Sequence, residues 1–151
     1  MKTILLVAAL LLAGTAGAQS ISPIASECGG KKCAGQFTAT NLNVSPTMVT
    51  IRAISFKPNQ PATELDPKIH LTLRDMSARL GPKASHIFFY QVQCDELPCW
   101  FALYATFTPL HKQNDTTAVT VTLSLPHSVW LCDKAQGCHV RIKKDVFGIG
   151  Q

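Results

Sequence analysis

The chain has 151 residues, of which 46% are hydrophobic and 15% charged, and it carries a formal net charge of +5. This length fits a single domain that can bury one core. This net charge is too small for a dedicated nucleic-acid binder, which would be densely cationic, so that class of protein is excluded. No apolar stretch reaches the roughly 20 residues that a bilayer span requires, so the sequence predicts no transmembrane segment.

Residues 1–18 have the order of a secretory signal peptide. Lys2 supplies the positive start, Ile4 to Leu12 form an unbroken apolar run, and the small residues end in Ala16-Gly17-Ala18. We therefore expect cleavage before Gln19 and a single secreted domain over residues 19–151. Loss of Lys2 lowers the formal charge to +4. The compartment is extracellular, or periplasmic if the source is bacterial.

All six cysteines lie in this secreted part and fall into three local pairs. An even number of cysteines in an exported chain predicts disulfides, and turn-prone residues separate the two members of each pair. We therefore predict three local bonds: Cys28–Cys33, Cys94–Cys99 and Cys132–Cys138. Two alternatives stay open. One is pairing across the fold, for example Cys94 with Cys132, and the other is a zinc site, although no metal or other cofactor is expected.

In chain order, most segments alternate between apolar and polar residues with the period of a strand. Such segments are residues 37–44, 48–56, 69–73, 118–125 and 139–142. Residues 48–56 change phase at Ile54, which predicts a bulge. In residues 118–125 the apolar set, with Val121 and Leu123 among it, is expected to point inward. One short helix is expected around Met76 to Leu80, stopped by Gly81-Pro82.

Two further segments are apolar in nearly every position. Residues 87–92 and 100–107 hold most of the aromatic side chains, so we expect central strands that are covered on both faces. Asn114-Asp115 should turn the second of them into residues 118–125 as a hairpin. Prolines are expected between strands. The predicted fold is all-β: a single antiparallel β-sandwich or small barrel of about seven to eight short strands, stapled by disulfides.

No catalytic motif is present in the sequence. The five histidines are scattered one per segment, which favours surface positions: His70, His86, His111, His127 and His139. The alternative is that two of them form the acid–base pair of a nuclease-like site together with Glu96 or lysines.

Two cysteine rings adjoin large aromatic residues. The Cys94–Cys99 ring carries Asp95 and Glu96 and leads directly into Trp100 and Phe101, and Trp130 lies beside Cys132. A stapled loop loses little entropy on binding, and tryptophan is a frequent anchor of interfaces. We predict a binding edge made of these five acidic and aromatic residues if both rings lie at one end of the fold. The alternative is a rigid turn with buried tryptophans.

Two sequons predict N-glycosylation if the source is eukaryotic. They begin at Asn114, in the expected hairpin turn, and at Asn43, which is followed closely by Pro46.

These features together favour a secreted, non-enzymatic binding protein. An effector, toxin or inhibitor that acts on a protein or glycan of a host or competitor fits best, with an extracellular protein or glycan as partner and no nucleic acid. One alternative is a carrier of a lipid or other apolar ligand between two sheets, lined by Phe89, Trp100, Phe101 and Phe107. The other is a small secreted hydrolase or nuclease.

Overall fold

The computed structural model describes residues 19–55, 64–110 and 121–133. The predicted signal peptide, the Asn114 sequon, Cys138 and the expected strand over 139–142 lie outside this part of the chain. Within it, no helix is long and apolar enough to cross a membrane.

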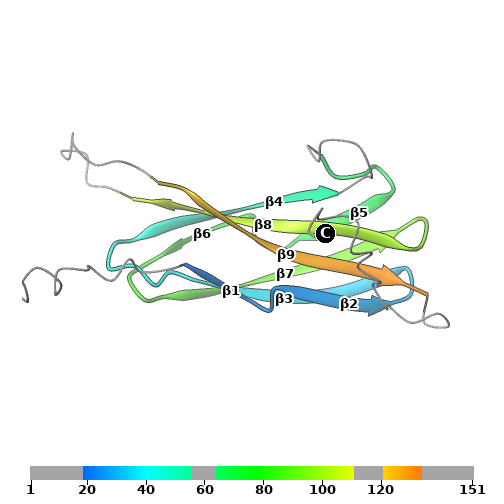
Figure 1. Ribbon diagram of the computed structural model, residues 1–151, viewed down its shortest axis with the longest axis horizontal. Coiled ribbons are helices and arrows are strands. Elements are labelled where there is room, and N and C mark those ends of the chain that lie inside the picture. Colours follow the sequence, from blue (N-terminus) through cyan, green and yellow to red (C-terminus); the bar gives the residue numbers. More distant parts are fainter. Residues whose placement is uncertain (1–18, 56–63, 111–120, 134–151) are drawn as a thin grey trace, which may run out of the picture.

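The described residues form nine strands in two sheets that pack face to face (Figure 1). The four-stranded sheet has the order β1 (Ser20–Ser22), β3 (Lys32–Thr40), β7 (Ser85–Cys94) and β5 (Ile69–Leu73). The five-stranded sheet has the order β2 (Ala25–Gly29), β9 (Leu123–Cys132), β8 (Cys99–Pro109), β4 (Thr47–Ser55) and β6 (Ser77–Leu80). The predicted β-sandwich is therefore confirmed.

One pair of strands departs from the predicted antiparallel plan. β2 runs parallel to β9, from Ala25 opposite Ser128 to Gly29 opposite Cys132. The chain leaves β1 in the four-stranded sheet, crosses through Pro23-Ile24 and enters the five-stranded sheet without reversing its direction. This change of sheet in mid-strand has no signature in the hydrophobic pattern.

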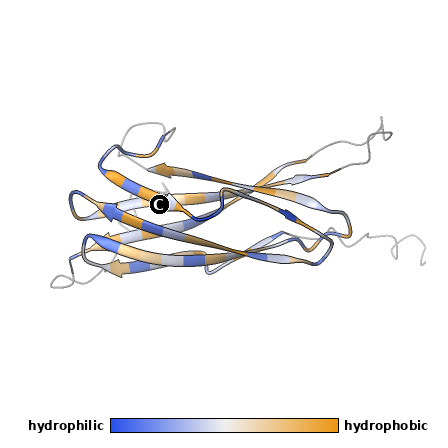
Figure 2. Ribbon diagram, turned by 180° about the vertical axis from the view of Figure 1, so that it is seen from behind, coloured by the Kyte–Doolittle hydropathy of each residue, from blue (hydrophilic) through white to orange (hydrophobic). Residues whose placement is uncertain are grey.

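The two aromatic segments become central strands, as predicted, but they are not covered on both faces. β7 lies between β3 and β5, and β8 lies between β9 and β4. Phe88 and Tyr90 of β7 are buried, whereas Ile87 and Phe89 are 42% and 39% exposed. A two-layer sandwich covers only the inner face of each sheet. Figure 2 shows the resulting alternation of hydrophobic and hydrophilic positions along the strands.

Two local predictions are wrong. β4 pairs with β8 in one unbroken register from Thr47–Pro109 to Ser55–Phe101, so there is no bulge at Ile54. The segment expected to be a helix is the strand β6, which pairs with β4. A helix of this length forms too few hydrogen bonds to offset the free-energy cost of its nucleation, whereas pairing with the edge of β4 gives these residues backbone hydrogen bonds.

β9 begins at Leu123 and continues to Cys132, beyond Leu125 where the predicted strand ended, and it contains a proline. The predicted pairing with β8 is confirmed, from Cys99–Leu131 to Phe107–Leu123. Pro126 lies inside the strand, contrary to the expectation that prolines fall between strands. The Ser128 N–H bonds to the Ile24 carbonyl, on the side away from β8. The Pro126 nitrogen faces this same side, beyond the end of β2, where no described strand needs its N–H.

Two of the predicted disulfides are confirmed. Cys28–Cys33 and Cys94–Cys99 have Cα separations of 5.9 and 6.3 Å. Cys132 is also disulfide-bonded, and its predicted partner Cys138 lies outside the described residues. The first bond joins β2 to β3 and the second joins β7 to β8. Both therefore tie the two sheets together at the same end of the sandwich, which we call the clipped end.

Candidate functional site

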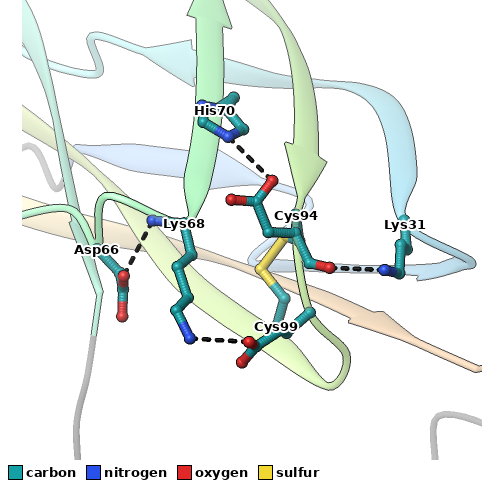
Figure 3. Close-up of polar contacts among 8 residues, drawn as sticks. Lys31, Asp66, Lys68, His70, Cys94 and Cys99 are labelled. Carbon is teal, nitrogen blue, oxygen red and sulfur yellow. Dashed lines mark hydrogen bonds and ion pairs between the residues drawn. A yellow bond between two sulfur atoms is a disulfide. The ribbon is translucent and has the colours of Figure 1, made fainter.

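The Cys94–Cys99 turn at the clipped end is held by contacts from β5 and from the β2–β3 turn (Figure 3). Asp95 Oδ1 lies 3.0 Å from His70 Nε2, and the Asp95 carbonyl accepts a 2.6 Å hydrogen bond from Lys31 Nζ. Glu96 Oε1 lies 2.9 Å from Lys68 Nζ. The Asp95 N–H donates to the Lys68 carbonyl at 3.0 Å.

These contacts change the chemistry that the sequence suggested for the turn. The two acids are already matched by basic groups, so the turn is not a free anionic loop. The hydrogen bond and the charge of Glu96 raise the pKa of Lys68 above its ordinary value. The sequence could not reveal the partners, because Lys68 and His70 reach the turn only through the register that places Ile69 opposite Cys94.

Trp100 and Trp130 meet on the outer face of the five-stranded sheet. They are register partners on β8 and β9, and their rings stack with centroids 4.7 Å apart and an interplanar angle of 12°. Trp100 is 37% exposed. Phe101 points the other way and is 0% exposed, so it belongs to the core and offers no surface to a partner. The structure thus brings four of the five predicted residues to the clipped end and buries the fifth.

His111 and His139 lie outside the described residues, and the three described histidines fall into two environments. His70 pairs with Asp95, and His86 lies 3.5 Å from Asp75. The first pair has the geometry of a base and its orienting acid, with Asp95 in place of the expected Glu96. In the described part of the chain, Asp95 is the only side chain that hydrogen-bonds to His70. A nucleophile in hydrogen-bond reach of the base, which hydrolytic chemistry of the triad type needs, is missing from this set.

His127 is fully buried, contrary to the prediction of a surface position. Its Nδ1 donates to the Pro23 carbonyl at 2.7 Å, and its Nε2 accepts a hydrogen bond from Tyr90 Oη at 3.2 Å. Burial lowers the pKa of His127 and raises the pKa of Tyr90, the latter partly offset by a hydrogen bond from Ser26. We call Ser26, Tyr90, His127 and the Pro23 carbonyl the buried polar network, which joins the two sheets.

The lining expected for an apolar carrier is not assembled. Phe89 and Trp100 lie on the outer faces of different sheets, while Phe101 and Phe107 lie between the sheets. The space between the sheets is filled by stacked rings, with Phe37 5.4 Å from Phe88 and 4.9 Å from His127. The four residues that were expected to surround one ligand therefore do not line a common space.

A feature that the sequence analysis did not recognise lies at the other end of β9. β2 covers one side of β9 only from Ser128 to Cys132, so no described strand pairs with that side between Leu123 and Pro126. Val121 and Leu123 were expected to be buried, but they are 70% and 41% exposed. We call residues 121–126 the open β9 edge. The alternation of apolar residues was visible in the sequence, but the same pattern is typical of a strand whose apolar face is buried, so it does not distinguish a buried face from an exposed one.

Metal and glycan sites have little support from the geometry. Among the described residues, no group of three or more His, Cys, Asp or Glu side chains could hold a metal ion. Asn43 lies in the turn between β3 and β4, where its backbone N–H donates to Asn41 Oδ1 at 3.1 Å. Its glycosylation stays a prediction.

Comparison with known proteins identifies the fold. No protein-family model and no curated protein matches the sequence. Among solved structures, the class 5 fimbriae chaperone CfaA aligns at 13% identity and a TM-score of 0.55 over 78% of this chain and 57% of that chain. A chain from the complex of the Salmonella enterica SafA pilin with the SafB chaperone aligns at 9% identity and 0.54, over 78% and 55%.

A third structure matches along nearly its whole length. WR4, an MSP family member from C. elegans, aligns at 10% identity and a TM-score of 0.50, over 76% of this chain and 96% of that one. The chain thus spans little more than half the length of the two pilus-related chains. At such low identity the likeness shows a shared β-sandwich fold and nothing further.

Proposed function

We propose that this chain is an exported, non-enzymatic binding protein that holds an extended segment of a partner protein along the open β9 edge. The observation that carries the proposal is an edge of β9 that pairs with no strand of the described residues and has exposed, alternating apolar side chains. Natural sheets usually protect such an edge with charges or a cover, because it pairs readily with other chains. An edge that is left open and apolar is suited to strand addition by a partner.

The backbone supports this mode of binding. Residues two apart on a strand direct their backbone groups to the same side, and Ser128 directs its N–H away from β8. The Ser124 N–H and the carbonyls of Ser124 and Pro126 therefore face the open side. A partner strand would pair with these groups and cover Val121 and Leu123.

The structural neighbours are consistent with a role in protein association. One of the matched chains belongs to a complex between a pilin and a chaperone. In the narrower form of our proposal, the partner is a protein of a host or competitor organism. Asp95, Glu96, Trp100 and Trp130 at the clipped end would then make a second contact with it.

The proposal is tested with a displayed library of random peptides selected on the oxidised secreted protein. We expect enrichment of extended peptides in which apolar residues alternate with polar ones. Leu123→Lys should weaken their binding at least about tenfold, because it places a charge where the apolar contact forms. On binding, the Ser124 amide should become protected against hydrogen exchange.

A matched control is Met76→Lys, which introduces the same charge at a side chain that is 66% exposed and lies outside the open β9 edge. This variant should bind the selected peptides like the unaltered protein. Equal binding by the Leu123→Lys variant, or an unprotected Ser124 amide in the complex, would refute strand addition at β9.

A further inference from the structure

The outer face of the four-stranded sheet carries a hollow that is lined by residues of β3, β5 and β7. The hollow has a volume of about 470 Å³. Five of its eight lining residues have polar side chains, and they come from three adjacent strands; the lining residues are Lys32, Cys33, Ala34, His70, Thr72, Gln91, Val92 and Gln93. It lies on the sheet opposite to the one that contains β9 and Trp100.

The strand register arranges these side chains in rows across the sheet. Lys32, Gln93 and His70 form one row, and Ala34, Gln91 and Thr72 form the next. The short side chain of Ala34 between longer neighbours accounts for the depression. Beyond the second row lies the exposed ring of Phe89, which has the Arg74 guanidinium 5.8 Å from its centroid.

The polar groups of the hollow are not consumed by contacts within the protein. The side-chain amides of Gln91 and Gln93 make no hydrogen bond to another described residue, and neither Lys32 nor Arg74 forms an ion pair in the described part of the chain. Elsewhere on the same face, Thr40 and Ser85 satisfy each other at 2.8 Å. The amides and cations of the hollow therefore remain available to a ligand.

We infer that this hollow, which we call the amide hollow, binds an acidic glycan, an oligosaccharide that carries carboxylates. Planar amides and a threonine hydroxyl match the hydroxyl groups of a sugar, since each amide both donates and accepts. Lys32 and Arg74 flank the rows and provide charge-assisted bonds to carboxylates. The nearest acid, Asp95, has its carboxylate engaged by His70.

The inference is independent of the open β9 edge and is tested on the isotope-labelled, oxidised protein by NMR. The probes are tetragalacturonic acid and sialyllactose, with neutral galactotetraose and lactose as their counterparts. We expect an acidic probe to shift the side-chain amide signals of Gln91 and Gln93 at millimolar concentration or below, and salt to weaken its binding.

Substitutions then locate the site. Gln93→Ala and Lys32→Ala should each weaken binding about tenfold, the effect of losing one hydrogen bond to a charged group. Arg79→Ala removes an equal charge from the five-stranded sheet and should leave binding unchanged. Absence of amide shifts with both acidic probes, equal binding of the neutral sugars, or affinity that Gln93→Ala and Lys32→Ala leave intact would each overturn the inference.

Discussion

Replacing His127 by glutamine should remove a pH dependence of stability that the buried polar network imposes. Burial lowers the pKa of His127 in the folded protein. In the unfolded chain this histidine has an ordinary pKa of about 6.5. Below that pH the unfolded state binds a proton that the folded state does not, so the free energy of unfolding falls as the pH is lowered.

The size of the effect is bounded by the single proton involved. The slope of the unfolding free energy reaches at most about 1.4 kcal/mol per pH unit, since one proton contributes 2.303RT. The contribution of His127 is complete above pH 6.5 and is lost progressively as the pH falls toward the folded pKa. A structural reason supports this sign: a second ring proton would place a charge in the core, against Phe37 and beside Tyr90.

The assay is urea unfolding of the native protein and the His127→Gln variant at a series of pH values between about 5 and 8, the range that brackets the histidine transition. Exposed pairs such as His70–Asp95 contribute equally to both proteins and cancel in the difference. Because glutamine does not titrate, the stability difference should change with pH only below about 6.5. A difference that stays constant across the series would refute the assignment of a lowered pKa to His127.

Two further substitutions test the packing of the clipped end and of the core. Gly35→Ala should destabilise the fold by about 1–3 kcal/mol in chemical unfolding, because the added Cβ would lie 2.3 Å from Tyr90 Oη; an unchanged unfolding midpoint would contradict this contact. Joint replacement of Cys94 and Cys99 by alanine should cost about 2 kcal/mol, the chain-entropy value for so short a loop. Chemical unfolding of the oxidised variant and of the oxidised unaltered protein measures this cost. Equal free energies of unfolding would indicate that the ion pairs alone hold the turn.

The sequence predicted correctly those features that depend only on residues close together in the chain. The alternation in residues 69–73 predicted β5, and the spacing of Cys28–Cys33 and Cys94–Cys99 predicted both bonds. Sequence-based prediction failed for features that depend on contacts between residues far apart in the chain. Residues 77–80 form a strand because β4 offers them an edge, and His127 is buried because Tyr90 and the Pro23 carbonyl satisfy both of its nitrogens. Neither partner is marked by any local pattern.

The same distinction explains the candidate surfaces. Trp100 stacks on Trp130 because the two are register partners on β8 and β9, and the predicted hairpin brings these two strands together. The open β9 edge instead depends on where β2 begins, and β2 begins at Ala25 because the chain crosses between the sheets at Pro23-Ile24. The His127 contact to the Pro23 carbonyl fixes this crossing. A residue that sequence analysis places on the surface therefore helps to set, from the core, how much of β9 is covered by β2.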